Sequence, residues 1–181
     1  YVQSFQVPPA VLRLAGIDTG ALAFNVAAAI PGTDPELQQQ WIVIGAHFDH
    51  LGVTGYGALD ERTATQPHLG ADDNASGTAA VLELALRLAN SPMRRPVLLV
   101  HFGAEELGLY GSKAFVLNAP APADSMVAMF NFDMIGQLRS RRLQLRALES
   151  ARDWDRVVDS VRADGRLAVE RVRDPDPMRA Q

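Results

Sequence analysis

The sequence predicts an α/β fold, in which helices pack in layers against a largely parallel β-sheet. Short apolar runs alternate with amphipathic stretches along the chain, which is the pattern of this fold class. Two of the runs, residues 41–46 (WIVIGA) and 96–103 (PVLLVHFG), are rich in branched apolar residues and are typical of strands buried on both faces. The 181 residues are also enough to bury a sizeable core within one domain.

The first part of the chain is expected to lead into this sheet. Residues 1–21, which contain two adjacent prolines, are interpreted as an N-terminal segment that is irregular or includes a short helix. Residues 22–30 (LAFNVAAAI) predict a strand that a Pro-Gly pair ends, and a polar turn at 34–40 precedes the strand at 41–46. Residues 52–72 contain four glycines and show no periodicity, which predicts a long loop of functional importance. We expect residues 22–181 to form one domain.

The rest of the chain continues the alternation of helices and strands. Val81, Leu84, Ala85 and Leu88 recur at helical spacing, which predicts a helix over 77–90. Further along we expect a buried strand at 96–103, a short helix at 107–117, a buried strand at 126–132, a strand at 142–148, a helix at about 151–164 and a strand at 167–172.

Composition and charge exclude several classes of protein. The chain has no cysteine, so a disulfide scaffold and a thiolate metal site are both impossible. No apolar run reaches the roughly 18 residues of a transmembrane helix, and the net charge of −4 argues against nucleic acid as a partner. Residues 1–136 carry 13 acidic and 6 basic residues, whereas residues 137–181 carry 8 acidic and 11 basic residues. We interpret the basic C-terminal part as a solvated surface, and we expect no membrane partner.

Four separate segments place imidazole or carboxylate groups where a predicted strand ends or a helix begins. In chain order these groups belong to His47, Asp49 and His50; Asp72 and Asp73; Glu105 and Glu106; and Asp133. Because ligands bind at the carboxyl ends of strands in α/β sheets, these groups could converge on one site. Imidazole and carboxylate ligands suit zinc and similar divalent ions, and a cation would offset the repulsion within such an acidic cluster.

Each segment alone also has a simpler interpretation. A histidine and an aspartate after a strand commonly form local hydrogen bonds, and an Asp-Asp-Asn run before a helix is usually an N-cap. A pair of glutamates at the start of a helix usually interacts with the helix dipole. The coincidence of four such segments is what favours a metal site.

Four motifs of this sequence carry a resemblance to a known family. They are GAHFDHLG (45–52), GADDNASG (70–77), GAEELGLYGS (103–112) and NFDMIG (131–136). This set resembles that of the co-catalytic zinc exopeptidases, metallopeptidase family 28, over residues 22–136, with residues 137–172 agreeing in element order only. The resemblance implies a three-layer α/β/α fold with a mixed, largely parallel central sheet. It also implies an aminopeptidase that removes N-terminal residues from peptide substrates, and it slightly favours export over a cytoplasmic location.

The resemblance further implies a role for each motif residue. His47 and Asp133 would bind one zinc ion, Asp73 would bridge two zinc ions, and Glu106 would bind the second. Glu105 would be the general base that takes a proton from the metal-bridging water and passes it to the leaving amine. Asp49 would orient the His47 ring through its other nitrogen. The peptide bond after Asp73 is expected to be strained and often cis in this family.

One ligand of the family pattern has no counterpart in this sequence. The family uses a histidine on a late loop for the second zinc ion, but no histidine follows His101. We therefore expect a chain truncated before that ligand, with weak metal binding at the second position and low peptidase activity. His50 is interpreted as a hydrogen-bonding residue near the site, His68 as a loop residue and His101 as a core histidine.

Other functions remain open on the same fold. A carboxypeptidase or a single-zinc glutaminyl cyclase would keep the fold and change the reaction. The Glu105-Glu106 pair and the context of Asp73 favour a peptidase, but the residues of the substrate pocket, which would decide, are scattered in the sequence. A non-catalytic interaction domain is favoured by the absent histidine, whereas the presence of Glu105 argues against it. The native metal, the residue preference and the oligomeric state are not readable from the sequence.

Overall fold

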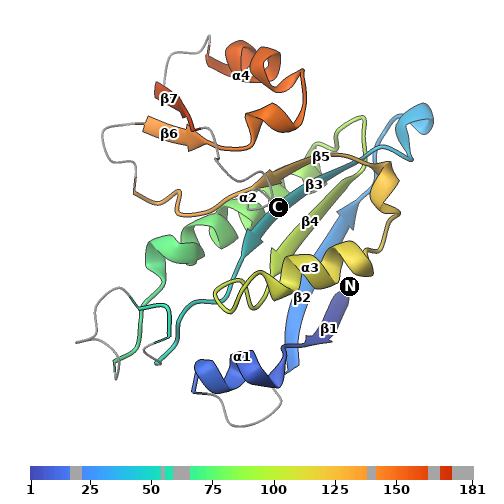
Figure 1. The fold of residues 1–181 in the computed structure, drawn as a ribbon. Coiled ribbons are helices and arrows are strands. Elements are labelled where there is room, and N and C mark those ends of the chain that lie inside the picture. Colours follow the sequence, from blue (N-terminus) through green and yellow to red (C-terminus); the bar gives the residue numbers. More distant parts are fainter. Residues whose placement is uncertain (17–21, 54–55, 59–65, 138–141, 163–167, 173–181) are drawn as a thin grey trace. The chain divides into compact units, whose positions relative to one another are not determined.

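The computed structural model describes residues 1–16, 22–53, 56–58, 66–137, 142–162 and 168–172 (Figure 1). The chain divides into two compact units, Tyr1–Gly136 and Gln137–Gln181. The candidate site residues named above all belong to the first unit. The predicted division at residue 21 stays a prediction.

The first unit is built on a five-stranded mixed sheet. Its strands are β1 (Val2–Gln6), β2 (Leu22–Ile30), β3 (Trp41–His47), β4 (Val97–Phe102) and β5 (Met126–Asn131), in the spatial order β1-β2-β4-β3-β5. β3 pairs in parallel with both β4 and β5, whereas β1 with β2 and β2 with β4 are antiparallel. The predicted α/β class with a mixed sheet is confirmed, and its parallel half is the half that leads into the predicted site.

Helices cover both faces of this sheet. They are α1 (Pro9–Leu14), α2 (Gly77–Asn90) and α3 (Tyr110–Leu117), with short helical turns at η1 (Pro35–Leu37), η3 (Ala71–Ser76) and η4 (Ala123–Ser125). Successive strand residues point to opposite faces. Accordingly, Val81 of α2 packs on the face that includes Ile44 and Leu99, and Phe115 of α3 packs on the other face. The three predicted layers are therefore present (Figure 1).

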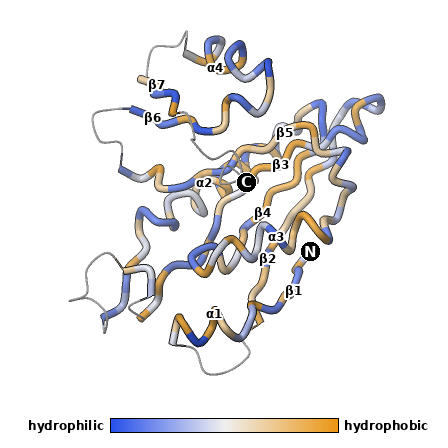
Figure 2. The backbone as a smooth tube through the Cα atoms, in the orientation of Figure 1, coloured by the Kyte–Doolittle hydropathy of each residue, from blue (hydrophilic) through white to orange (hydrophobic). Residues whose placement is uncertain are grey.

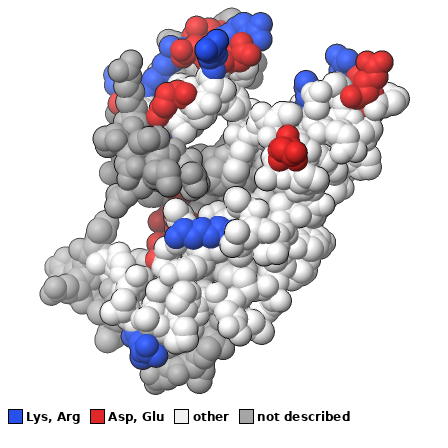
Figure 3. Space-filling model, turned by 45° about the vertical axis from the view of Figure 1, so that its right-hand side comes forward, with Lys and Arg blue, Asp and Glu red and all other residues white. Residues whose placement is uncertain are grey.

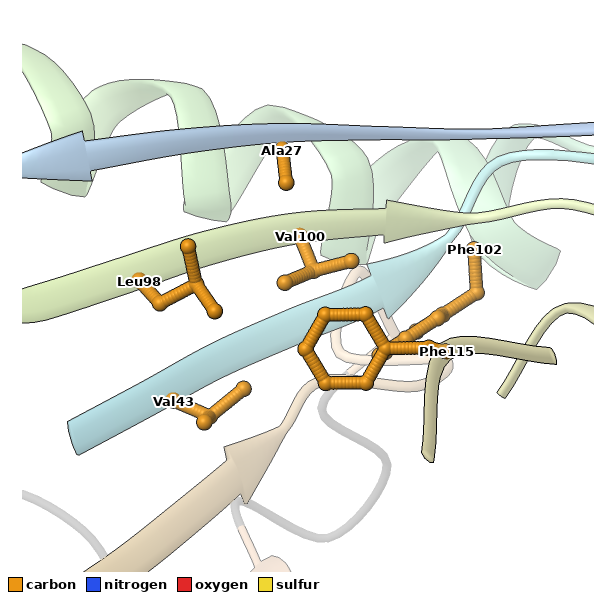
Figure 4. Close-up of a cluster of buried hydrophobic side chains, with 6 residues drawn as sticks. All are labelled: Ala27, Val43, Leu98, Val100, Phe102 and Phe115. Atoms are coloured by element: carbon orange, nitrogen blue, oxygen red, sulfur yellow. The ribbon is translucent and has the colours of Figure 1, made fainter. Parts of the chain in front are cut away.

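The core is concentrated on β3 and β4, which are hydrophobic along most of their length in Figure 2. On the α3 face, the rings of Phe102 and Phe115 meet edge to face with their centroids 5.5 Å apart. Val43, Leu98, Val100 and Ala27 complete this cluster (Figure 4). Such dense packing fixes the ends of β3 and β4 relative to each other. Several of the candidate site residues lie at or just after these strand ends.

Two expectations for this unit were wrong. Residues 2–6 form a strand rather than an irregular lead-in, although the short helix after it is present as α1. β5 is not buried on both faces, because Val127, Met129 and Phe130 are 51%, 46% and 39% exposed. β5 lies at one edge of the sheet and therefore has a neighbouring strand on one side only.

The second unit contains a small two-stranded parallel sheet and one helix. β6 (Arg142–Leu145) pairs with β7 (Ala168–Arg171), and η6 (Leu148–Ser150) and α4 (Trp154–Arg162) lie between them in the chain. Arg171 forms ion pairs with Asp155 and Asp159 of α4. Basic and acidic side chains are interspersed on the surface of this unit (Figure 3), which agrees with a solvated charged surface. Among the residues described, no helix is long and apolar enough to cross a membrane.

Candidate metal centre

His47, the last residue of β3, lies at the centre of the candidate site. Its side chain is buried, with 3% of its surface exposed. Its Nε2 atom lies 3.2 Å from Oδ1 of Asp73, 3.5 Å from Oδ1 of Asp133 and 4.0 Å from Oε2 of Glu105. Residues from the end of β3, from η3, from the turn after β4 and from the turn after β5 thus meet at one point.

A second group of donor atoms adjoins the first. Nδ1 of His50 lies 2.8 Å from Oε1 of Glu106 and 4.0 Å from Oδ1 of Asp73. The donor atoms of His47, Asp73 and Asp133 lie within 4.8 Å of one another, and so do those of His50, Asp73 and Glu106. Asp73 is the residue that belongs to both groups.

The donor set fits zinc ions. Ligands of one tetrahedral zinc ion, bound at about 2.0–2.1 Å, lie about 3.3 Å from each other. The separations of 3.2 and 3.5 Å around Nε2 of His47 match that geometry. Imidazole and carboxylate groups are also the ligands that zinc accepts when cysteine is absent.

Asp49 links the turn after β3 to the turn after β4. Its carboxylate accepts hydrogen bonds from the main-chain N–H groups of Glu105 (3.1 Å) and Glu106 (3.3 Å). Nδ1 of His47 lies 3.1 Å from the main-chain oxygen of Asp49 and 3.6 Å from its carboxylate. The main-chain oxygen is therefore the better acceptor for the ring, and the role of the Asp49 carboxylate in orienting His47 stays a prediction.

The turn that carries Asp73 is bonded to the turn that carries Asp133. The side chain of Asn74, which is 1% exposed, donates to the main-chain oxygen of Phe132 and accepts from the main-chain N–H of Met134. Ser76 Oγ accepts from the N–H of Ile135, and the Asp72 carboxylate accepts from the N–H of Gly136. These bonds fix where Asp133 stands relative to Asp73.

The backbone of these two turns has two uncommon conformations. The peptide bond between Asp73 and Asn74 is cis, which confirms the expectation for this position. Met134 has a φ of 50°, in the left-handed region that non-glycine residues seldom occupy. Neither Asp72 nor Asp73 caps α2. The first N–H group of that helix, from Gly77, is bonded to Oδ1 of Asn74 instead.

Burial and mutual repulsion shift the titration of the site residues. Burial lowers the pKa of His47, but the neighbouring carboxylates of Asp133, Asp49 and Glu105 outweigh it and raise the pKa to about 10. Burial raises the pKa of Glu105 to about 6, an effect that the His47 charge opposes and the Glu106 charge reinforces. Burial and the charge of Asp73 also raise the pKa of Glu106. The site therefore favours a positive charge at its centre.

The remaining histidines lie at different distances from the site. The rings of His68 and His50 meet edge to face with centroids 6.3 Å apart, and Nε2 of His68 is buried with no hydrogen-bond partner among the described residues. Nε2 of His101 lies 3.3 Å from the main-chain oxygen of Thr78, outside both donor groups.

Sequence reasoning did not find the bonds between the two turns. The contact between His50 and Glu106 was not foreseen either. The bonds between the two turns involve Asn74 and Ser76 of GADDNASG and the main chain of NFDMIG. The polar residues of these motifs other than His47, Asp73 and Asp133 were therefore the available sign of those bonds.

Comparison with known proteins places these motifs in a family. The sequence model of Peptidase family M28 matches residues 25–179. The chain is 40% identical over 122 residues to leupeptin-inactivating enzyme 1 of Streptomyces exfoliatus. The aligned region covers 65% of this chain and 24% of that protein. The chain is 47% identical over 114 residues to an aminopeptidase of Pseudomonas aeruginosa, which covers 62% of this chain and 18% of that protein. The chain thus spans about a quarter or less of the length of these relatives.

Solved structures agree on the fold. A Zn-dependent exopeptidase from Parabacteroides distasonis superposes with a TM-score of 0.72 at 20% identity, covering 99% of this chain and 65% of that one. A glutaminyl cyclase from Bacteroides thetaiotaomicron has the same TM-score and identity, covering 96% of this chain and 62% of that one. The motif residues meet at one site, and the family model matches nearly the whole chain, so the chain belongs to peptidase family M28.

Proposed function

We propose that this chain carries the catalytic site of a zinc-dependent aminopeptidase, which hydrolyses the N-terminal peptide bond of peptide substrates. The observation that carries the proposal is the meeting of His47, Asp73 and Asp133 at zinc-ligand spacing, with Glu105 beside them. The family membership and the named aminopeptidase relative support the same activity.

Asp73 is the residue proposed to serve two zinc ions. His47 and Asp133 would hold one ion with it, and Glu106 would hold the other. When bound, the two ions would polarise the scissile carbonyl and lower the pKa of the attacking water. His47 would bind through Nε2, because its Nδ1 faces the main-chain oxygen of Asp49.

Glu105 is proposed as the general base. In the metal-free fold its pKa of about 6 leaves it mostly ionised at neutral pH, as a group that accepts a proton must be. Its carboxylate would take a proton from the attacking water and deliver it to the leaving amine. Asp49 would hold the main chain of Glu105 in place through the hydrogen bond to its N–H.

The test combines a chelator with a variant of the proposed base. Aminoacyl-p-nitroanilides with a free amino group should be cleaved, and N-acetylated versions of the same substrates should not. A chelator should abolish the activity and added Zn²⁺ should restore it. Glu105→Gln should lower kcat by about 10²–10⁴-fold with little change in zinc affinity, whereas Glu83→Gln, on the exposed side of α2, should leave kcat unchanged.

The alternatives predict different products. A glutaminyl cyclase would release ammonia from peptides with N-terminal glutamine, and the solved structure of such an enzyme with this fold supports testing it. A carboxypeptidase would shorten peptides from the other end, and a non-catalytic domain would bind peptide without turnover. Peptide mapping by mass spectrometry would separate the four outcomes. Export of the protein is part of the proposal, and cell fractionation would test it.

A further inference from the structure

We infer that His50 is a positioning residue that fixes the Glu106 carboxylate for the second metal ion, rather than a metal ligand itself. The inference deepens the proposed function and rests on it, since it assigns the support of one proposed zinc ligand.

The distance between the two side chains separates the two possible roles. Nδ1 of His50 and Oε1 of Glu106 are 2.8 Å apart, which is the length of a charge-assisted N–H···O hydrogen bond. Two ligands of one zinc ion would be about 3.3 Å apart, as the donors around His47 are. His50 therefore donates to Glu106 and leaves the other carboxylate oxygen, Oε2, for a metal ion.

The surroundings of the His50 ring hold it in this orientation. Gly70 has a φ of 63°, and a Cβ atom at that position would meet both Cβ and Cγ of His50 at 3.0 Å. The edge-to-face contact with the ring of His68 restricts His50 from a second direction. The His50 side chain is 22% exposed, so solvent competes only partly for its hydrogen bond.

The same short turn thus holds Glu106 at two points. Asp49 accepts from the main-chain N–H of Glu106, and His50 donates to its side chain. The two contacts together fix both the position and the rotation of the Glu106 carboxylate. This assigns a use to the second histidine of the HFDH motif, which the proposed catalytic machinery does not require.

The test is a calorimetric titration of Zn²⁺ into the metal-free 181-residue chain and three variants. His50→Leu removes the donor and should weaken one of the two zinc affinities by about 10–100-fold, the usual effect of removing a residue that orients a ligand. His50→Asn places an amide N–H near the position of Nδ1 and should restore that affinity to within a few-fold. His101→Leu is the matched control and should change neither affinity.

Each outcome decides between the roles. Loss of a whole equivalent of zinc in both His50 variants would show that His50 is a ligand and overturn the inference. Equal affinities in the wild-type chain and His50→Leu would overturn it as well, and so would a failure of His50→Asn to restore binding. Far-UV circular dichroism would establish that each variant is folded. If the wild-type chain bound no zinc, the proposed function itself would fail, a result distinct from all of these.

Discussion

Nε2 of His47 lies 3.2 Å from Oδ1 of Asp73, although 25 residues stand between them in the sequence. β3 delivers the histidine and η3 delivers the aspartate, and the parallel half of the sheet brings both to the same edge. The same oxygen of Asp73 lies 4.0 Å from Nδ1 of His50. Asp73 therefore stands between the two donor groups, and substitutions there should affect both.

Asp73 and Asp133 should differ in how many zinc ions their removal affects. Asp73→Asn should weaken both zinc affinities, because its oxygen serves both groups. Asp133→Asn should weaken only the affinity of the group around His47. Each zinc affinity should fall by more than 10–100-fold, which is the usual effect of removing a residue that only orients a ligand. Calorimetric titration measures both, and a loss of only one zinc ion in Asp73→Asn would contradict the shared role.

Zinc binding should strengthen as the pH rises from 7 to 9. His47 has a pKa of about 10 in the metal-free fold, against an ordinary value of 6.5, so it is charged at neutral pH and must lose a proton to bind zinc. The affinity should therefore rise about tenfold per pH unit over this range. Competition titrations with a calibrated chelator at several pH values would measure the slope, and a flat profile would rule out a protonated His47.

The same pKa has the opposite effect on the stability of the metal-free chain. A histidine with a raised pKa stabilises the fold fully below its unfolded pKa of 6.5, and this contribution is lost as the pH rises toward 10. Zinc should therefore add more to the melting temperature at pH 9 than at pH 7. Thermal unfolding with and without Zn²⁺ at the two pH values would show the difference.

The elements with a strong apolar pattern could be predicted from the sequence, and a strand with a polar core residue could not. β2 and α2 have the predicted bounds, because their residues follow the periods of a strand and a helix. In β1 the buried residue is Gln3, whereas Val2 is 63% exposed. Gln3 can be buried because its side chain forms hydrogen bonds to Asn25 and to the main chain of α3. A hydrophobic pattern carries no sign of such a strand.

The meeting of the donor groups could be predicted from the sequence, whereas the hydrogen bonds that support them could not. His47, Asp73, Glu106 and Asp133 lie where strands end or a helix begins, so their convergence follows from the topology. The bond between His50 and Glu106 depends on the orientation of two side chains from different turns. Nothing in the spacing of these residues along the chain specifies that orientation.

Asn74 should be essential for the placement of Asp133. Asn74→Ala would remove the side-chain partners of the Phe132 carbonyl and the Met134 N–H, and would leave the buried N–H of Gly77 with a main-chain acceptor only. We expect a loss of about 3 kcal/mol in the free energy of unfolding and a 10–100-fold weaker zinc affinity at His47. Chemical denaturation and calorimetry would measure the two effects.

The matched control for this variant is Asn90→Ala. Asn90 is exposed at the end of α2 and donates one hydrogen bond to Leu86. Its removal should cost less than about 0.5 kcal/mol and leave zinc binding unchanged. Equal zinc affinities in the wild-type chain and Asn74→Ala would show that the bonds between the two turns do not position Asp133.

Asn25 and Gln3 should be coupled in the stability of the sheet that supports Glu105 and Glu106. Asn25 is completely buried, donates to Gln3 and to the carbonyl of Gly111, and accepts from the N–H of Gly103, two residues before Glu105. Asn25→Ala should therefore lower the free energy of unfolding by about 3 kcal/mol, because it leaves buried polar groups unpaired. Gln3→Ala should lower it by about 1–2 kcal/mol. The double variant should lose about 1 kcal/mol less than the sum, since the two changes break the same bond. Strict additivity in urea denaturation would mean that the bond between these side chains contributes nothing to holding β1 and the turn after β4 together.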